Sequence, residues 1–173
     1  AMDIVTSDLP QYGGRVGTYG GAGRNFAIQN CDFLLAIGCR LSGRITGGKP
    51  ETFARSAKRY IVDIDAGVLD TIHQPQPFHG VIQCDAAVFA LKLANRYKTK
   101  EFSENTNHWS SWMRRVQTWR DQYDPVLPEH LSQQAVHPYA FMRKLSSLVP
   151  ANAIITGDTG GNVVLIAHAF ETK

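Results

Sequence analysis

Short apolar runs, separated by polar or glycine-rich segments, set the pattern of the first half of the chain. Residues 33–37 are all apolar and lie between Asp32 and Gly38, which is typical of a strand buried on both faces of a parallel sheet. Residues 60–65 are rich in β-branched side chains and predict a second strand, and residues 78–83 predict a third. A glycine loop and a helical turn separate the first two runs, so we expect these strands to be parallel neighbours.

Helical segments are expected between and after these strands. The clearest is an amphipathic stretch at 86–97, which Asp85 can cap. Shorter helices or helical turns are predicted at 24–31, 51–57 and 67–72, and prolines predict a loop at 74–77. Strands that alternate with helices indicate the α/β class, with a Rossmann-like parallel sheet flanked by helices.

A tryptophan-rich helix follows a polar stretch at 98–107 that suits the end of a domain. Its apolar stripe recurs at spacings of three and four residues and consists of Trp109, Trp112, Val116 and Trp119. Such a stripe more often clamps a helix onto a domain surface than lines a cofactor site. Residues 121–135 hold two prolines and no clear period, so they are expected to be a linker.

The C-terminal part predicts the first βα unit of a second α/β domain. A helix should begin at His137, bury Phe141, Leu145 and Leu148, and end before Pro150. Residues 153–156 then predict a strand, and residues 163–170 predict an apolar helix.

Two glycine-rich segments are candidate anion sites. In the loop at 38–48, glycines allow a ligand to approach the backbone, and Arg40 and Arg44 favour an anion such as a pyrophosphate. The turn at 157–162 between a predicted strand and helix offers backbone N–H groups to a phosphate. The alternatives are a mobile surface loop and an ordinary βα turn. The segment at 13–23 is a turn or a third ligand-facing loop.

Carboxylates follow the second predicted strand. Asp63 and Asp65 can accept hydrogen bonds from a ribose, as acidic residues at strand ends do in nucleotide-binding folds. Capping of the next helix is the commoner use of Asp in this position, and both interpretations stay open.

Composition narrows the function classes. The chain has 173 residues, 43% hydrophobic and 19% charged, with a net charge of +3, all ordinary for a globular protein. No basic run with interleaved aromatics argues for nucleic acid, and no apolar stretch approaches a membrane span. The histidines show no pair at metal-ligand spacing. Three cysteines without a CxxC motif indicate free thiols, so we expect a cytoplasmic protein.

Several motifs occur in an order that resembles one family. They are GCRLSGRITG at 38–47, FARSAK at 53–58 and VDID at 62–65, with NFAIQ at 25–29 upstream and Cys84-Asp85 downstream. This order and spacing resembles the middle domain of acetolactate synthase, a thiamine-diphosphate-dependent enzyme. The resemblance covers nearly the whole chain, and it is most specific at 24–65.

The resemblance implies a domain organisation and two cofactors. Residues 1–97 would be a middle domain that lacks its N-terminal part, 98–136 a linker, and 137–173 the start of the diphosphate-binding domain. In the family the middle domain holds FAD, and the matching positions are Gly38, Arg40, Arg44, Asp63, Ile64 and Asp85. Thiamine diphosphate would be held at Thr159, Gly160, Gly161 and Asn162. Ser42 and Gly43 replace a pair of Asp in the FAD-binding members, so either FAD or a vestigial pocket is expected.

The implied reaction is decarboxylation of a 2-oxo acid such as pyruvate and ligation of the two-carbon unit to a second carbonyl. The catalytic glutamate and the Mg²⁺ ligands would lie outside this chain, so no catalytic or metal-binding residue is assigned here and the fragment alone should be inactive. The full-length protein should be a homo-oligomer. The alternatives are a stand-alone FAD- or ADP-binding module without catalysis and a related 2-oxo acid decarboxylase.

Overall fold

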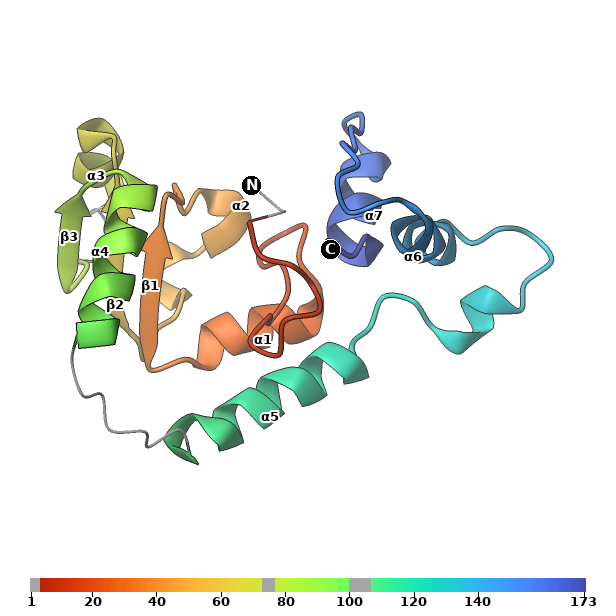
Figure 1. The fold of residues 1–173 in the computed structure, drawn as a ribbon, viewed down its shortest axis with the longest axis horizontal. Coiled ribbons are helices and arrows are strands. Elements are labelled where there is room, and N and C mark those ends of the chain that lie inside the picture. The colour runs from red at the N-terminus through yellow and green to blue at the C-terminus, as the bar shows by residue number, and fades with distance from the viewer. Residues whose placement is uncertain (1–3, 73–76, 100–106) are drawn as a thin grey trace. The chain divides into compact units, whose positions relative to one another are not determined.

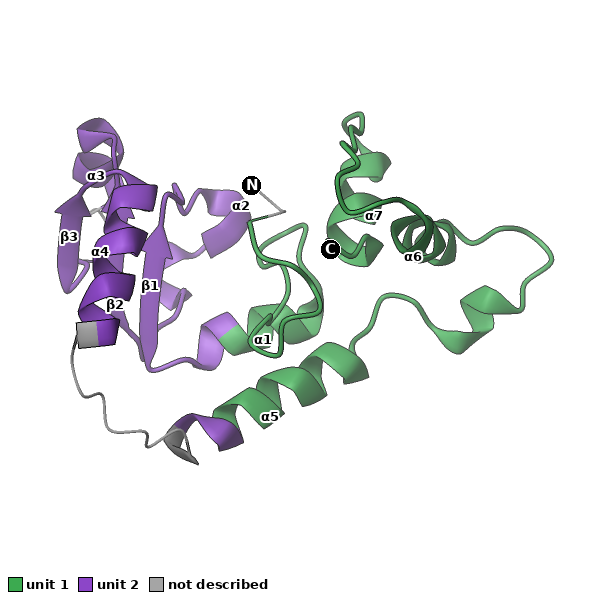
Figure 2. Cartoon of the chain, viewed as in Figure 1, with its two compact units in different colours: residues 1–27, 112–173 green, residues 28–111 purple. Residues whose placement is uncertain are grey.

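The computed structural model describes residues 4–72, 77–99 and 107–173 (Figure 1). The chain divides into two compact units: unit 1 contains residues 1–27 and 112–173, and unit 2 contains residues 28–111 (Figure 2). The predicted loop at 74–77 and polar stretch at 98–107 lie largely outside the described residues.

A three-stranded parallel sheet forms the centre of unit 2 (Figure 1). Its order is β1 (Phe33–Ile37), β2 (Lys58–Asp63) and β3 (Gly80–Gln83), and both strand pairs are parallel. The predicted parallel pairing of the first two strands is therefore confirmed, as is the Rossmann-like fold class. The third strand is two residues shorter at its start than the predicted run at 78–83.

The strand register separates the side chains into two layers. Ala36, Ile61 and Val81 are partners across the sheet and face the main apolar cluster, which also contains Leu69. Leu69 belongs to α3 (Ala66–Ile72), so this helix covers that face. On the opposite face Val62 is fully buried, where α4 (Ala86–Thr99) contacts β2.

Two predictions for the first strand and its loop need correction. β1 is not buried on both faces, because Phe33 is 50% exposed. It is an edge strand of the described sheet, since it pairs only with β2. The segment at 38–48 is not all loop, since Gly43–Thr46 form the short helix α2. The predicted helical turn at 51–57 is the 3₁₀ helix η1 (Pro50–Thr52), which ends before Phe53 and Ala54 enter the core.

Unit 1 joins segments that are far apart in the sequence. Its α1 (Ala22–Asn30, of which residues 28–30 belong to unit 2) meets α5 (Asn107–Gln122, of which residues 107–111 belong to unit 2). A Cβ at Gly23 would come 2.2 Å from the carbonyl oxygen of Trp119, so only glycine permits this approach. Phe26 packs edge-on against Trp119 and Tyr123, with ring centroids 6.0 and 5.2 Å away. Trp119 and the buried Val116 therefore pack as predicted for a helix clamp, whereas Trp109 at the start of the stripe is 59% exposed.

The remaining elements of unit 1 are η2 (Pro128–Leu131), α6 (Pro138–Leu148) and α7 (Gly161–Ala169). The predicted start of α6 beside His137 and its end before Pro150 are confirmed. Its predicted buried side is wrong, because Leu148 is 69% exposed and Phe141 is half exposed. Ser146 is the buried residue instead, and its Oγ donates to the carbonyl oxygen of Arg143 at 2.7 Å.

The predicted strand at 153–156 does not form. These residues have no regular structure, and Ile154 is 91% exposed. A strand requires a hydrogen-bonded neighbour, and the only sheet among the described residues is the three-stranded sheet of unit 2. The following helix starts two residues earlier than predicted, at Gly161.

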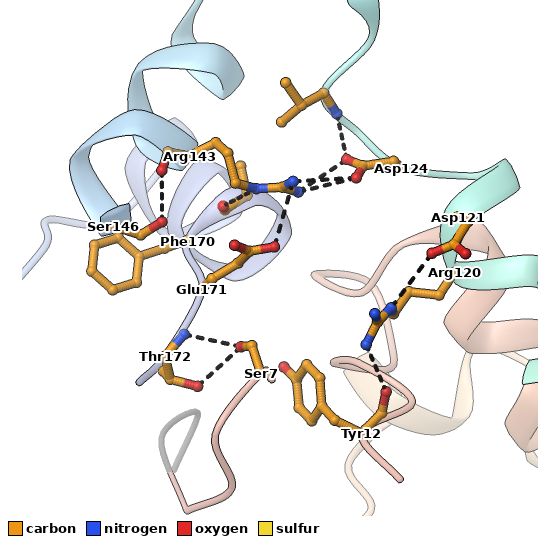
Figure 3. A network of polar contacts seen from close by, with 12 residues as sticks. Ser7, Tyr12, Arg120, Asp121, Asp124, Arg143, Ser146, Phe170, Glu171 and Thr172 are labelled. Atoms are coloured by element: carbon orange, nitrogen blue, oxygen red, sulfur yellow. Dashed lines mark hydrogen bonds and ion pairs between the residues drawn. The ribbon is translucent and has the colours of Figure 1, made fainter. Parts of the chain in front are cut away.

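Polar contacts hold α6 and α7 to the segments around them (Figure 3). The Arg143 guanidinium donates to both carboxylate oxygens of Asp124 at 3.0–3.3 Å and to the Ala169 carbonyl oxygen at 3.1 Å. Ser7 donates its backbone N–H to the Thr172 carbonyl oxygen at 2.8 Å, and its Oγ accepts from the Thr172 N–H. The charge-assisted bonds of Arg143 and the neutral bonds between Ser7 and Thr172 thus join segments that are far apart in the sequence.

The structure also bears on the state of the cysteines and on membrane-spanning helices. Cys31, Cys39 and Cys84 are free thiols, as predicted. Of the helices in the described ranges, none combines the length and apolar character that crossing a bilayer requires.

Candidate functional site

The carboxyl edge of the unit 2 sheet gathers residues from three loops. Parallel strands end at the same edge, so the segments after β1, β2 and β3 bring Arg40, Asp65 and Asp85 to one side of the sheet. Gly38 opens the first loop with a left-handed φ of 58°, and its N–H donates to the Val62 carbonyl oxygen at 2.8 Å. A glycine at this turn avoids the cost of a Cβ in the left-handed region.

Leu41 marks a strained point in the same loop. It adopts a φ of 45° although it is a bulky residue, and its side chain is buried in the core of unit 2. Left-handed backbone in a non-glycine residue costs on the order of 1–3 kcal/mol and clusters at functional sites. Burial of Leu41 holds the preceding residue, Arg40, at the edge of the sheet.

Carboxylates at this edge mostly serve the backbone. Asp63 is buried and its Oδ1 accepts from the Asp65 N–H at 3.0 Å. Asp65 Oδ1 accepts from the Gly67 N–H at 2.9 Å in the first turn of α3, and Asp85 Oδ1 accepts from Ala87 and Val88 in α4. The capping interpretation therefore holds for Asp65 and Asp85.

Arg40 forms the main ion pair of the site. Its Nη2 lies 3.6 Å from Asp65 Oδ2, and the two side chains are 75% and 49% exposed. An ion pair this exposed is weak, so an anionic ligand can compete with Asp65 for the guanidinium at little cost.

A cavity of about 420 Å³ opens beside this ion pair. It lies within unit 2, between the segment that follows β1 and helix α3, and its polar lining consists of Arg40, Ser42, Thr46, Arg59 and Thr71. Leu41, Phe53, Ile72 and Phe78 contribute apolar walls. The size and mixed lining are those of a small-molecule pocket.

The structure brings together only some of the predicted nucleotide-site residues. Arg40 lines the cavity, and Gly38 and Asp63 lie at the adjoining strand ends. Arg44 is exposed on α2 and is not part of the cavity lining. Ile64 is exposed immediately after β2, and Asp85 is the cap of α4.

Sequence reasoning did not identify Arg59 as a cavity residue. Arg59 lies two residues before Ile61 in β2, so both side chains point to the side of the sheet that carries the core. The guanidinium lies 5.5 Å from the ring centroid of Phe78 and donates to the Phe53 carbonyl oxygen at 3.5 Å. The sequence signal that could have identified Arg59 is a cation two residues before an apolar position of the strand.

The second predicted site is the turn at 159–162 in unit 1. Its residues are exposed, and Gly160 adopts a φ of 74° as the N-cap of α7, with no side-chain cap. The positions that a Cβ would take at Gly160 and Gly161 are open, so a ligand can approach the backbone of this turn. The Thr159 N–H already donates to Asp158 Oδ1 at 2.7 Å. In the described ranges, no cluster of three or more His, Cys, Asp or Glu is arranged to hold a metal ion.

Comparisons with known proteins show which family the chain resembles. Residues 1–91 match the thiamine pyrophosphate enzyme central domain. The chain is 31% identical over 170 residues to the acetolactate synthase large subunit of Pyropia yezoensis, covering 98% of this chain and 28% of that protein. It is 30% identical over 173 residues to the acetolactate synthase isozyme 2 large subunit of Escherichia coli, covering 99% and 29%.

A relative from a third lineage gives the same result. The probable acetolactate synthase large subunit of Methanocaldococcus jannaschii is 31% identical over 178 residues, covering 96% of this chain and 27% of that protein. The chain thus spans under a third of the length of the relatives that it matches.

Proposed function

Because the chain belongs to the thiamine pyrophosphate enzyme family through its central domain, we propose that it is a fragment of an enzyme of the acetolactate synthase type. The whole enzyme decarboxylates a 2-oxo acid such as pyruvate and joins the two-carbon unit to a second carbonyl. One observation carries this proposal. Three relatives that match 96–99% of the chain are all named as acetolactate synthase large subunits.

The proposed organisation follows the family. Residues 1–97 belong to the central domain, residues 98–136 form a linker, and residues 137–173 begin the domain that grips the diphosphate. The catalytic glutamate and the Mg²⁺ ligands are assigned to parts of the enzyme outside this chain. We place the enzyme in the cytoplasm as a homo-oligomer.

The turn at 159–162 fits the diphosphate of thiamine diphosphate. Gly160 leaves the first turn of α7 uncapped, so the amides at Gly161 and Asn162 are available to phosphate oxygens. The Asn162 side chain is exposed at the same turn and can add a hydrogen bond. When bound, thiamine diphosphate supplies a nucleophilic carbon and an electron sink for decarboxylation. The contribution of these residues is to bind and orient the diphosphate.

This chain alone should have no carboligase activity. A few hydrogen bonds to amides contribute about 0.5–1.5 kcal/mol each, which does not immobilise a flexible charged cofactor. None of the glutamates in the sequence corresponds to the residue that activates the cofactor in this family.

FAD, or its ADP portion, is a second candidate ligand, and the unit 2 cavity is the observation that favours it. Arg40 offers a cation to a phosphate, and the hydroxyls of Ser42, Thr46 and Thr71 offer hydrogen bonds. In Asp63 and Asp85, Oδ1 already accepts a backbone N–H. Each residue would therefore accept a hydrogen bond from ribose or adenine mainly through Oδ2. The absence of an Asp pair at Ser42 and Gly43 argues for weak binding.

Pyruvate consumption tests the proposed reaction. The enzyme at the length of its relatives, supplied with thiamine diphosphate, Mg²⁺ and FAD, should consume pyruvate, whereas the 173-residue chain should not. In the long enzyme, Asn162→Ala should raise the KM for thiamine diphosphate. The matched control is Asn152→Ala, another exposed asparagine of unit 1 that lies outside the turn. Turnover by the short chain at the rate of the long enzyme would contradict the proposal.

A further inference from the structure

The glycine-rich segment at 13–23 has a structural role that the proposed function does not use. Gly14 and Gly17 adopt left-handed φ values of 97° and 91°, a backbone conformation that glycine reaches without strain. A Cβ at Gly20 would come 2.2 Å from the Arg15 carbonyl oxygen. The segment therefore folds into a tight loop, and Arg15 is the one charged residue in it.

Asn25 fixes this loop to α1. Its Oδ1 accepts from the Gly17 N–H at 2.7 Å, and its Nδ2 donates to the Gly17 carbonyl oxygen at 3.1 Å. A side-chain amide that bonds both backbone groups of one residue holds that residue in a single orientation. The loop and Asn25 both belong to unit 1, so Arg15 extends from a fixed point of that unit.

Arg15 binds the C-terminal end of α7. Its Nη1 donates to the carbonyl oxygens of Ile166, Ala167 and Phe170 at 3.0, 3.1 and 2.8 Å. The last carbonyls of a helix lack intrahelical donors, and the negative end of the helix dipole lies there, so a guanidinium stabilises this end. Arg15 is therefore a cap for α7 that comes from a segment about 150 residues earlier in the chain.

The two ends of α7 differ in burial. Ala167, Ala169 and Phe170 are buried, whereas Gly161 and Asn162 in the first turn are exposed. The nine residues of α7 make a helix roughly 13 Å long, since each residue adds about 1.5 Å. The direction in which the exposed turn points is therefore set at the opposite, buried end, where Arg15 binds.

We infer that Arg15 is a positioning residue for thiamine diphosphate, which acts through α7. The inference rests on the proposed function, in which the amides of Gly161 and Asn162 bind the diphosphate. Because Arg15 binds the far end of the helix, its charge does not contact the diphosphate. Its contribution is to hold the axis of α7, so that the exposed turn is already oriented when the cofactor arrives.

The surroundings of Arg15 allow the side chain to be shortened in a test. Arg15 borders a small cavity of about 80 Å³ in unit 1, which Arg24 and His168 also line. Arg15→Gln enlarges this cavity and removes the donor to α7, whereas Arg15→Lys keeps a charged donor. The matched control is Arg114→Gln, which removes an exposed positive charge of the same unit.

Hydrogen exchange, measured by mass spectrometry on the cofactor-free enzyme at the length of its relatives, tests the anchor. Arg15→Gln should speed exchange in peptides that cover α7 by about tenfold or more, because charge-assisted bonds to the helix end are lost. Peptides from residues 112–122 of α5 should exchange as in wild type, which separates a local effect from general instability. Arg114→Gln should leave α7 unchanged. Wild-type exchange of α7 in Arg15→Gln would overturn the inference.

Calorimetric titration of the same proteins with thiamine diphosphate, in the presence of Mg²⁺, tests the positioning role. Arg15→Gln should raise the Kd about tenfold or more, Arg15→Lys should recover part of this loss, and Arg114→Gln should bind as wild type does. The KM for thiamine diphosphate should rise in Arg15→Gln more than kcat at saturating cofactor falls. A loss of folded enzyme would lower the rate at saturation instead.

The diphosphate site and the role of Arg15 fail in different ways. Wild-type cofactor affinity in Asn162→Ala would contradict the diphosphate site, and the role of Arg15 with it. Weaker binding in Asn162→Ala together with wild-type affinity in Arg15→Gln would overturn the role of Arg15 alone. If far-UV circular dichroism shows that Arg15→Gln does not fold, Arg15→Met takes its place with the same expected and contradicting results, since it keeps the apolar stem and loses the donors.

Discussion

Units 1 and 2 differ in what fills their interiors. Unit 2 has an apolar cluster built on one face of a regular sheet, in which Ala36, Ile61 and Leu69 are all buried. Unit 1 buries fewer large apolar side chains, and its segments are joined through Arg143, Arg15 and their acceptors. The first interior depends on area removed from water, and the second on the geometry of charged donors.

This difference teaches where each unit is sensitive. Apolar burial is non-directional and hardly changes with salt, whereas exposed or half-exposed ion pairs weaken as ionic strength rises. A perturbation should therefore act on one unit through volume and on the other through charge.

The sequence supplies a separate reporter for each unit. Cys31, Cys39 and Cys84 all lie in unit 2, so their reactivity with a thiol reagent in urea follows that unit. Burial raises the pKa of the Cys31 thiol, which slows its reaction further while unit 2 is folded. Trp112 and Trp119 lie in unit 1, whereas Trp109 lies in unit 2. In a Trp109→Phe background the tryptophan fluorescence therefore follows unit 1, and this background is used for the measurements below.

The largest effect is expected from Ile61→Ala. Ile61 is completely buried at the centre of β2, so its truncation should cost about 2–5 kcal/mol. Thiol reactivity in urea should shift to lower denaturant by a similar amount at low and at high salt. The matched control is Ile64→Ala, 65% exposed just after the same strand, which should cost less than about 0.5 kcal/mol. Equal costs for the two variants would show that the apolar core does not stabilise unit 2.

A smaller, salt-dependent effect is expected from Arg143→Gln. The substitution removes the bonds to Asp124 and to the Ala169 carbonyl oxygen, and partial exposure reduces the expected cost to about 1–2 kcal/mol. Tryptophan fluorescence in urea should report the loss, and the loss should shrink in 1 M salt. Arg114→Gln, an exposed arginine of the same unit, is the control and should be neutral. A salt-independent loss would contradict the charge-based description of unit 1.

The same contrast explains how much the sequence could predict. In unit 2, apolar runs bounded by glycine-rich segments predicted three parallel strands and the helices after them. The prediction succeeded because the local pattern of apolar residues matches the side chains that the folded unit buries. In unit 1, the spacing of Phe141, Leu145 and Leu148 predicted a buried face that the structure does not have. No local pattern shows that Arg143 on that helix will bind Asp124 from the preceding linker.

The candidate site divides in the same way. Gly38 and Arg40 were found from sequence, since a glycine loop after a buried strand is a local signal. The small cavity of unit 1, which Arg24 and His168 line, could not be predicted, because its lining residues come from five separate segments. The strand predicted at 153–156 failed because a strand depends on a neighbour that its own sequence does not encode.

A pH-dependent effect on stability, smaller than the effects of Ile61→Ala and Arg143→Gln, is expected at His168. Burial and, next, the positive charge of Arg24 lower the pKa of His168 below its ordinary value of 6.5. Between that lowered pKa and 6.5 the unfolded chain binds more protons than the folded one, so stability rises with pH through this window and is complete above it. His168→Gln should flatten this part of the stability profile, measured by tryptophan fluorescence in urea from pH 5 to 8. An unchanged slope would mean that His168, which faces Arg24 and Tyr139 and shares the cavity wall with Asp124 and Arg143, does not titrate differently on folding.

The smallest effect on stability is expected from Arg40→Gln, and it separates structural charge from functional charge. The Arg40–Asp65 pair is mostly exposed, and pairs of this kind contribute about 0–1 kcal/mol, so thiol reactivity in urea should change little. Arg143 stabilises unit 1, whereas Arg40 lines the unit 2 cavity without stabilising it, so its charge is available to a phosphate. Calorimetry with ADP should therefore show weaker binding to Arg40→Gln than to wild type, while Arg44→Gln, on α2 but outside the cavity lining, should bind as wild type does. Equal ADP binding by all three chains would exclude Arg40 as the phosphate contact, and a large loss of stability in Arg40→Gln would make it a structural residue like Arg143.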